Sequence, residues 1–247
     1  MNVLRLALVV LSACVALLIG ASSAGAGSGA TCSGGVISTG TYQSLTVTGF
    51  CSLPDSGSVV VRGGLTIAPD AGLNAITEAT LTVSGGISVG NGGFLGLGCA
   101  PSTGCATTTF DHIGGGVRAD QPLAMLIHGN IIDGGVSMQG GGGGVTCDSA
   151  ALFGGPPFTA IEDNTINGGV SVSGYQSCWL GVFRNTVRGS VSIMNNTLAD
   201  PDATEVTDNV ISGNLACFGN TPGAQVGDSG GGPNTVSGQK LGECAGL

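Results

Sequence analysis

One short phrase recurs along this chain and constrains its fold more than any other part of the sequence. The phrase reads Asn, two mostly apolar residues, a polar residue, Gly, a small residue and then aliphatic–Ser–aliphatic. Clear copies begin at Asn130, Asn164 and Asn185, and degraded copies begin at Asn209 and Asn234. Their starts are 34, 21, 24 and 25 residues apart. A period of this length is typical of solenoid proteins, in which each unit buries its apolar face only by stacking on its neighbours.

The N-terminal half carries the same unit in a different form. Residues 59–67 (VVVRGGLTI) align with residues 81–89 (LTVSGGISV) at a shift of 22 residues, and residues 45–49 (LTVTG) resemble an earlier copy. Each unit reads as two short alternating strands on either side of a Gly-containing bend, and no segment shows a capped helical period. The sequence therefore predicts an all-β fold, a right-handed parallel β-helix (β-solenoid) of roughly 8–10 rungs with a C-terminal cap.

The alternation along each strand predicts which side chains face inward. Aliphatic residues at the first and third strand positions point into the coil, because side chains alternate between the two faces of a strand. The five Asn residues that open the phrases form another column, at a bend, where stacked amides hydrogen-bond along the coil. We interpret that Asn column as structural rather than ligand-binding. The expected inward column consists of Val136, Val170, Val191 and Leu215.

Small hydroxyl side chains lie between these aliphatics and are expected to point outward. With strands about 4.8 Å apart, they would form a regularly spaced hydroxyl face. Such a face could match a periodic partner such as a glycan or ice, but small β-forming residues facing water explain it more simply. The residues expected on this face are Thr66, Thr82, Ser88, Ser137, Ser171 and Ser192.

Two segments interrupt the period and indicate where a site would lie. Residues 97–127 contain a Gly triplet, and residues 139–159 contain five consecutive glycines. Insertions from solenoid turns emerge on one side and often build the binding face. We therefore expect residues 27–247 to form a single β-helix domain with these two insertions. Residues from about 209 to 247 are expected to form the cap, because a terminal repeat must cover the open strand edge.

Residues 1–26 have the pattern of a secretory signal peptide. Arg5 precedes an apolar stretch over residues 6–19, and Ala24-Gly25-Ala26 forms an A-x-A cleavage pattern. The apolar stretch is short for a membrane span. An alternative is a lipobox at residues 11–14, which would leave Cys14 as a lipidated first residue. We expect a protein that is secreted or associated with the cell envelope after cleavage near Ala26, with no transmembrane span.

The eight cysteines after Cys14 are an even set, which in an exported chain indicates disulfide bonds. Eight cysteines allow 105 connectivities. We expect neighbours along the chain to pair, because each such bond joins points in one turn of the coil or in adjacent turns. The expected pairs are Cys32–Cys51, Cys99–Cys105, Cys147–Cys178 and Cys217–Cys244. The sequence has no Cys-x-x-Cys and its two histidines lie outside any ligand-spaced cluster, so it predicts neither a metal site nor a cofactor.

The charge of the chain argues against nucleic acid as a partner. The net charge is −9, and it becomes −10 if the segment carrying Arg5 is removed. Phosphate binding needs a basic footprint, which this chain does not have.

A Gly-rich segment near the C-terminus invites comparison with serine proteases. Residues 227–233 (GDSGGGP) nearly spell the sequence around the nucleophile of trypsin-like enzymes, but with one extra Gly. Acyl transfer of that type needs a His oriented by an acid. His112 and His128 do not have that sequence context, so we interpret the segment as a Gly-rich loop.

The main enzymatic alternative comes from the fold, because β-helices commonly host polysaccharide lyases and glycoside hydrolases. A lyase needs clustered carboxylates and a basic residue, and a hydrolase needs two or three carboxyl groups around the scissile bond. No polygalacturonase motif set is present, and aromatic residues make up only 4% of the chain, which leaves little for stacking on sugars. The charged residues on successive units that such an enzyme could use are Asp111, His112, Asp133, Glu162, Asp163, Arg184 and Arg188.

The C-terminal tail carries a resemblance to known proteins. Residues 214–222 (NLACFGNTP), residues 233–238 (PNTVSG) and residues 242–244 (GEC) follow repeated Asn-Thr-Val/Ile-x-Gly units. With the signal-like N-terminus, this pattern resembles secreted actinobacterial right-handed parallel β-helix proteins of unassigned function, over about residues 41–244. The resemblance implies the fold and export, and it supplies no catalytic residues. We therefore predict an exported structural or binding module, with an extracellular glycan or cell-wall component as its partner, and keep a carbohydrate-active enzyme as the alternative.

Overall fold

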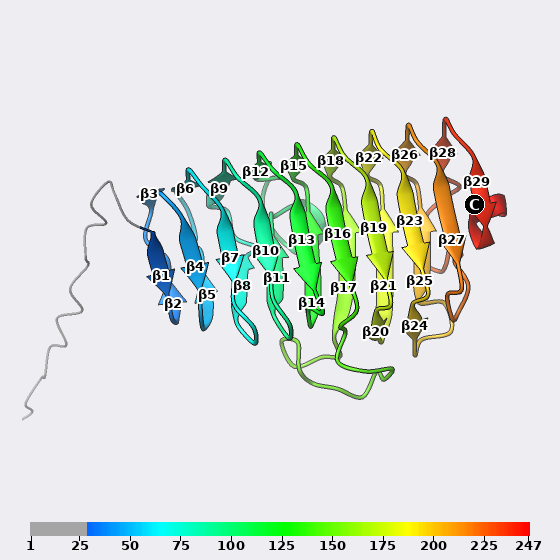
Figure 1. Ribbon diagram of the computed structural model, residues 1–247, viewed down its shortest axis with the longest axis horizontal. Coiled ribbons are helices and arrows are strands. Elements are labelled where there is room, and N and C mark those ends of the chain that lie inside the picture. Colours follow the sequence, from blue (N-terminus) through cyan, green and yellow to red (C-terminus); the bar gives the residue numbers. More distant parts are fainter. Residues whose placement is uncertain (1–28) are drawn as a thin grey trace, which may run out of the picture.

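The computed structural model describes residues 29–247 as one parallel β-solenoid. The expected signal peptide and Cys14 lie outside the described residues. The coil has about nine turns, and each regular turn contributes one strand to each of three parallel sheets, which we name sheets A, B and C. It is right-handed: the strands of sheet A run downward at the front of Figure 1, the chain returns behind them, and each turn advances toward the C-terminus. The predicted fold class is thus confirmed.

Every strand is short, and every pairing between successive turns is parallel. Sheet A consists of β1 (Ala30–Cys32), β4 (Leu45–Val47), β7 (Leu65–Ile67), β10 (Ile87–Val89), β13 (Val117–Asp120), β16 (Val136–Gln139), β19 (Val170–Ser173), β23 (Val191–Met194), β27 (Leu215–Phe218) and β29 (Lys240–Gly242). Sheet B consists of β2 (Gly35–Val36), β5 (Phe50–Ser52), β8 (Gly72–Ala75), β11 (Phe94–Leu97), β14 (Ala124–His128), β17 (Phe158–Glu162), β21 (Trp179–Phe183) and β25 (Thr204–Thr207). Sheet C consists of β3 (Gly40–Tyr42), β6 (Ser58–Val61), β9 (Thr80–Val83), β12 (His112–Ile113), β15 (Ile131–Ile132), β18 (Thr165–Ile166), β22 (Thr186–Val187), β26 (Val210–Ile211) and β28 (Thr235–Val236).

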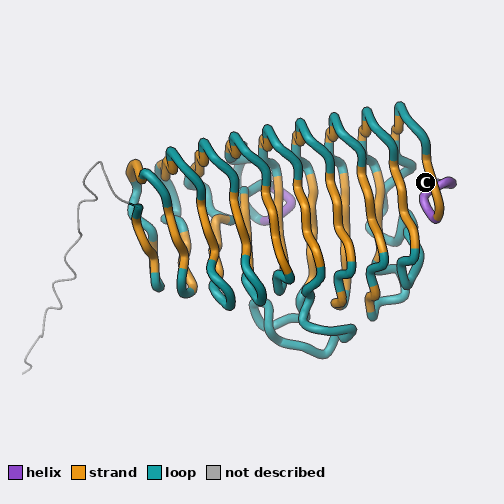
Figure 2. The backbone as a smooth tube through the Cα atoms, viewed as in Figure 1, coloured by secondary structure: helices purple, strands orange, loops and turns teal. Residues whose placement is uncertain are grey.

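Few elements lie outside the three sheets. Strands β20 (Gln176–Ser177) and β24 (Thr197–Leu198) pair with each other. The helical elements among residues 29–247 are two short 3₁₀ segments, η1 (Pro101–Thr103) and η2 (Glu243–Gly246). Strands and loops therefore make up nearly all of the described chain, as Figure 2 shows.

The core is a set of apolar columns that run along the coil axis. Val136, Val170, Val191 and Leu215 occupy matching positions in β16, β19, β23 and β27, and each is at most 1% exposed. This confirms the predicted inward column. Burial of such columns is the main stabilising term, because each buried Val or Leu side chain contributes roughly 1.5–3 kcal/mol.

Sheet B takes one strand from each regular turn, and the sequence pattern does not reveal these strands. Its strands are buried on both faces along much of their length, as in β11 and β14. Without polar residues at alternate positions, such a strand lacks the period-two signal on which recognition depends.

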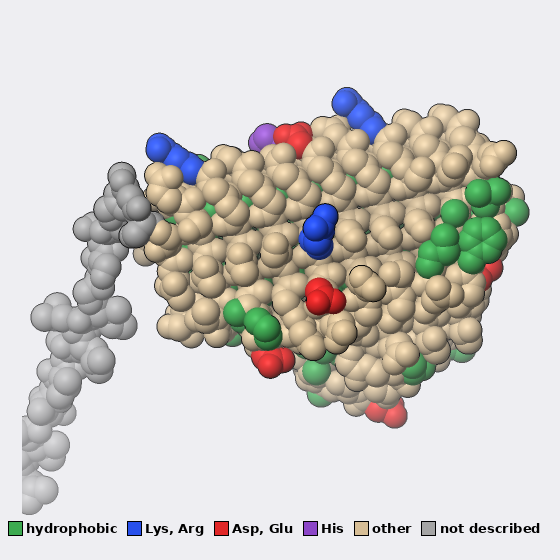
Figure 3. Space-filling view, viewed as in Figure 1, with side chains coloured by type: hydrophobic (Ala, Val, Ile, Leu, Met, Phe, Trp, Pro, Cys, Tyr) green, Lys and Arg blue, Asp and Glu red, His purple; other side chains and the backbone are tan. Residues whose placement is uncertain are grey.

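The outward hydroxyl face lies on sheet A and differs from the expectation at one position. Thr66, Ser88, Ser137, Ser171 and Ser192 form one outward row, which Arg118 interrupts between Ser88 and Ser137. Thr82 lies on sheet C instead, because residues 81–83 belong to β9. Seen from the side of sheet A, the surface carries only scattered charged side chains (Figure 3).

The insertions are shorter than the breaks in the period suggested. Residues 112–127 lie in the first expected interruption, yet they supply β12, β13 and most of β14. The first insertion therefore covers residues 98–111 and contains η1. The second covers residues 140–157 and protrudes from one end of the turn between β16 and β17 (Figures 1 and 2). Parallel pairing with the preceding turn continues into β28 and β29, inside the expected cap of residues 209–247.

All four expected disulfide bonds are present: Cys32–Cys51, Cys99–Cys105, Cys147–Cys178 and Cys217–Cys244. The first joins sheets A and B near the N-terminal end. The second closes a loop inside the first insertion, and the third ties the second insertion to the residue before β21. The fourth fixes η2 to β27.

The Asn column at the corner between sheets B and C is a continuous hydrogen-bonded ladder. In each step, Oδ1 of one Asn accepts hydrogen bonds from the backbone N–H and the Nδ2 group of the Asn one turn earlier, as Asn185 does from Asn164 at 3.1 and 2.9 Å. Each Nδ2 also donates to a carbonyl of sheet B. The structural interpretation of this column is thus confirmed. The ladder runs through Asn130, Asn164, Asn185, Asn209 and Asn234.

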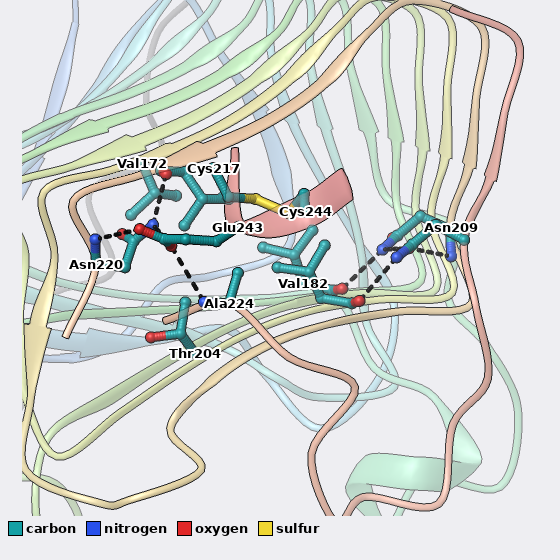
Figure 4. The surroundings of a disulfide bond; sticks show 12 residues. Val172, Val182, Thr204, Asn209, Cys217, Asn220, Ala224, Glu243 and Cys244 are labelled. Atoms are coloured by element: carbon teal, nitrogen blue, oxygen red, sulfur yellow. Dashed lines mark hydrogen bonds between the residues drawn. A yellow bond between two sulfur atoms is a disulfide. The ribbon is translucent and has the colours of Figure 1, made fainter. Parts of the chain in front are cut away.

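A second, shorter ladder ends in the C-terminal cap. Asn196 donates to Oδ1 of Asn220 in the same pattern. Glu243 then takes the place of a further Asn: its carboxylate accepts from the backbone N–H and Nδ2 of Asn220 and from the backbone N–H of Ala224, at 2.7–3.1 Å (Figure 4). Burial raises the pKa of Glu243, but these hydrogen bonds outweigh burial and lower the pKa overall. The Cys217–Cys244 bond holds this carboxylate over the last turn.

Asp111 occupies the ladder position that precedes Asn130. Ile131 pairs with His112, which places Asp111 and Asn130 in register, and Oδ1 of Asp111 accepts from the backbone N–H of Leu81 as an Asn would. However, Oδ2 of Asp111 and Oδ1 of Asn130 are buried without a hydrogen-bond partner among residues 29–247. A protonated Oδ2 would supply the missing donor. Burial raises the pKa of Asp111 to about 7, although nearby donor groups on Leu81, Thr109 and Gly98 oppose this shift.

Replacing Asp111 by Asn should therefore repair the ladder. The folded state binds the Asp111 proton more tightly than the unfolded state, so the free energy of unfolding of the wild type should fall as the pH rises from about 4 to about 7 and then level off. At pH 8, D111N should be more stable by about 1–3 kcal/mol, the cost of an unsatisfied buried polar group. Urea unfolding at pH 5 and pH 8 measures both effects, and D55N, at an exposed carboxylate, is the control. Equal stability of D111N and wild type at pH 8 would contradict this account.

Candidate binding site

The aromatic residues of this chain gather on the outer face of sheet B. The chain has seven Phe residues and one Trp. Five of these Phe residues and the Trp lie on sheet B or on the second insertion, which folds over this sheet. They are Phe50, Phe94, Phe153, Phe158, Trp179 and Phe183. Composition alone suggested too few aromatics for a binding platform, but the fold concentrates them on one face.

Two neighbouring hollows lie between these rings. The larger, which we name the Trp pocket, has a volume of about 360 Å³ and is lined by residues that include Phe158, Trp179, Phe183, His128 and Glu162. The smaller, which we name the Phe pocket, has a volume of about 270 Å³, and Phe50, Asp70, Phe94 and Leu123 are among its lining residues. Phe153 lines both pockets.

Each insertion contributes to these walls, as the sequence led us to expect. Thr103 of the first insertion lines the Trp pocket. From the second insertion, Leu152 packs into a small apolar cluster with Phe94, Leu126 and Ala160, outside the main core. This cluster anchors the loop on sheet B and keeps the neighbouring Phe153 beside the pockets.

The rings contact one another in two groups. Phe153 lies edge-on to Phe94, with ring centroids 5.2 Å apart, and Phe50 stacks on Phe94 at 6.4 Å. In the second group, Trp179 lies 6.1 Å from Phe158 and 5.3 Å from Phe183. Gly181 lies below the second group, and a Cβ atom there would clash with the rings of both Trp179 and Phe183. The glycine thus lets these rings close over the strand.

A charged cluster borders the Trp pocket. Nδ1 of His128 lies 2.5 Å from Oε1 of Glu162. Arg184 reaches Oε2 of Glu162 at 2.8 Å and binds both carboxylate oxygens of Asp163 at 2.7 and 2.9 Å. Its guanidinium also lies 5.8 Å from the ring centroid of Phe183. Two carboxylates and one guanidinium therefore form one network beside the aromatic rings.

The network fixes the charge of Glu162 and Arg184. Burial raises the pKa of Glu162, but His128 and Arg184 together outweigh it and hold the pKa below its ordinary value. The hydrogen bond with Asp163 is the main cause of a raised pKa at Arg184. Glu162 is thus an ionised carboxylate at neutral pH, and Arg184 keeps its charge.

The structure brings together only part of the candidate catalytic set. Glu162, Asp163 and Arg184 meet at the Trp pocket, and His128 joins them from the preceding turn, because it pairs in register with Glu162. This pairing of His128 with Glu162 follows from the register of β14 and β17, which the sequence pattern does not reveal.

The remaining candidates lie elsewhere. Asp111 belongs to the Asn ladder. His112 and Asp133 form an exposed pair on sheet C at 2.9 Å, and Asn167 donates to the same Asp133 carboxylate. Arg188 is exposed after β22. The seven candidates for the enzymatic alternative therefore do not share one groove, because the turn assigns successive residues to different sheets.

Glu205 is a buried carboxylate that sequence reasoning missed. It lies on the strand that follows Trp179 in sheet B, and it is only 1% exposed. Its Oε1 accepts a hydrogen bond from Nε1 of Trp179 at 3.1 Å, and Oε2 has no partner in the described part of the chain. The Gly-rich loop packs over it, since a Cβ at Gly227 would clash with the carboxylate. The protease-like segment thus covers a carboxylate and adopts the loop structure expected for it.

Potential metal ligands in residues 29–247 are sparse. The only group of three that lies close together is Cys147, Cys178 and Asp200. Because the two cysteines form a disulfide, they offer no thiolate, and this group is not a metal site.

Comparison with known proteins adds no assignment. No family model, curated protein or solved structure matches this chain. Within residues 29–247, no helix is long and apolar enough to cross a membrane.

The Trp179–Glu205 hydrogen bond predicts a specific coupling. Trp179→Phe keeps a ring in the pocket but leaves both oxygens of a buried carboxylate unpartnered, which should lower the free energy of unfolding by about 1–3 kcal/mol. The same substitution should cost less in a Glu205→Gln background, because a neutral amide is easier to bury unpaired. A double-mutant cycle by urea unfolding measures the difference, and equal costs in the two backgrounds would show that the bond contributes nothing.

Proposed function

We propose that this protein is an exported binding module that holds an extracellular glycan on the outer face of sheet B. The observation that carries the proposal is the concentration of aromatic rings there, in a chain with few aromatic residues. The Trp pocket combines these rings with His128, Glu162 and Thr103. Ligand pockets are typically apolar and aromatic with a few placed polar groups.

A sugar suits this mixture of surfaces. A pyranose ring has apolar C–H faces that pack against aromatic rings, and its edge carries hydroxyl groups that bond to charged or polar side chains. Trp179 and Phe158 are partly exposed, so their rings are accessible to such a face. Arg184 keeps its second terminal nitrogen outside the hydrogen bonds to Glu162 and Asp163, and its side chain is 43% exposed.

The geometry favours binding over hydrolysis. Hydrolysis needs two carboxyl groups around the scissile bond, with one protonated to act as the acid. Among the described residues that line the Trp pocket, one carries a carboxyl group, and this residue is Glu162. Its lowered pKa makes it a poor acid, and its two oxygens contact His128 and Arg184. Asp111 has the raised pKa that an acid needs, but its side chain belongs to the Asn ladder.

Export is part of the same proposal. Four disulfide bonds favour an oxidising compartment such as the cell exterior. The sequence pattern of residues 1–26 supports secretion, and the resemblance to secreted actinobacterial β-helix proteins stays a prediction. A stable coil clamped by disulfides suits a protein that must display a rigid site outside the cell.

Trp179 offers a direct test, because it is the only Trp in the chain. We expect its fluorescence to shift saturably when a hexasaccharide of glucose, mannose, xylose or N-acetylglucosamine binds in the pocket. Phe158→Ala should remove the response to that sugar, since it deletes one wall of the pocket. Ser137→Leu, which alters the hydroxyl row on sheet A, should leave the response intact.

Two results would contradict the proposal. One is the absence of any fluorescence change across the whole sugar panel with folded protein. The other is a response that survives F158A but disappears in S137L, which would move binding to the hydroxyl face of sheet A.

A further inference from the structure

The two pockets lie along the coil axis rather than across it. The Phe pocket spans β5, β8 and β11, and the Trp pocket spans β14, β17 and β21, all successive strands of sheet B. From Phe50 on β5 to Trp179 on β21 there are five strand spacings, or about 24 Å at about 4.8 Å each. A ligand that fills both pockets must therefore be long and straight.

Phe153 lies where such a ligand would cross from one pocket to the other. Leu152 and Gly155 form a bridge, so Phe153 and Gly154 are the central residues of a tight turn. Both have positive φ, +49° and +86°, which matches a turn that favours Asn-Gly. A Phe in this conformation is strained, and strained residues cluster at functional sites. The residue is nevertheless 64% exposed, so packing alone does not account for its conformation.

The charges around the groove select against an anionic ligand. Glu162 and Asp163 border the Trp pocket with one guanidinium, that of Arg184, between them. Asp70 lines the Phe pocket, and the whole chain carries a net charge of −9. Uronate polymers and anionic lipids would thus meet net repulsion. A ligand with an apolar face and uncharged polar groups meets no such repulsion.

We infer that the groove takes a linear, uncharged glycan that lies across Phe153 and fills both pockets. This inference rests on the proposed function and names its ligand class. Phe153 is the stacking residue that connects the two pockets, so the affinity must increase with the length of the glycan. Short sugars occupy one pocket only.

The test is a length series followed by Trp179 fluorescence. The probes are the disaccharide to hexasaccharide of whichever neutral sugar gives a response, with oligogalacturonides of the same lengths as the charged counterpart. In the wild type, the affinity should rise about tenfold or more from the disaccharide to the hexasaccharide, as expected when a second pocket is engaged. Oligogalacturonides should bind at least tenfold more weakly, because about 1.4 kcal/mol of repulsion weakens binding tenfold.

Phe153→Asn separates the role of the ring from that of the fold. Asn is favoured at this turn position, so the variant should fold at least as well while losing the connection between pockets. The affinity of this variant for the hexasaccharide should exceed its affinity for the disaccharide by about threefold or less. Phe110→Asn is the matched control, because Phe110 has a φ of +50° and is 63% exposed but lines neither pocket.

Each failure has a distinct meaning. If the disaccharide binds as tightly as the hexasaccharide, or if F153N keeps the full length dependence, the inference is overturned while the Trp pocket remains a binding site. Tighter binding of oligogalacturonides than of neutral sugars overturns the charge argument and with it the ligand class. If no sugar of any length alters Trp179 fluorescence, the proposed function itself fails.

Discussion

The structure depends on one constraint, which is that every turn must present its strands in register with the turn before. The Asn ladder meets this constraint at the corner between sheets B and C, where the backbone leaves one sheet for the next. From Asn164 onward, each Asn accepts from a backbone N–H of the preceding turn and donates to a carbonyl of sheet B, as Asn164 does with Asn130 and Ile127. Displacement by one residue would turn the apolar columns outward and break these bonds together. Asp111 and Glu243 show two ways in which a carboxylate can replace an Asn: inside the ladder it needs a proton, and at the end it accepts donors as an anion.

The same register creates the candidate site. Sheet B faces the core on one side and the insertions on the other, so its outer residues need not be polar. Successive turns then place Phe158 next to Trp179 and His128 next to Glu162, although these residues are far apart in sequence. The second insertion, tied by Cys147–Cys178, adds Phe153 above them. The candidate groove thus lies on the sheet whose outer face carries aromatic rings, whereas the larger hollow on sheet A, of about 640 Å³, is lined mainly by glycines and serines.

The repeat and the inward columns could be predicted because both depend on a short-range sequence pattern. The disulfide pairs could be predicted because the cysteines after Cys14 are even in number and neighbours along the chain lie in one turn or in adjacent turns. The inward column that includes Val136 and Val170 and the Asn ladder followed from period alone. Sheet B could not be found in this way, since β11 and β14 lack alternation. Because the strands of sheet B could not be predicted, neither could the contacts of His128 with Glu162 and of Trp179 with Glu205. For the same reason, Thr82 was placed on the wrong sheet. Both insertions line the Trp pocket, and the insertions are where the sequence directed the search for a site.

The central claim is that sheet B, rather than the hydroxyl row of sheet A, is the binding face. A crystal structure of the protein grown with a neutral hexasaccharide tests it most directly. We expect sugar rings packed against Trp179 and Phe158, with the chain of sugars running along the coil axis past Phe153. Sugar density along Ser137, Ser171 and Ser192, with both pockets of sheet B empty, would contradict it.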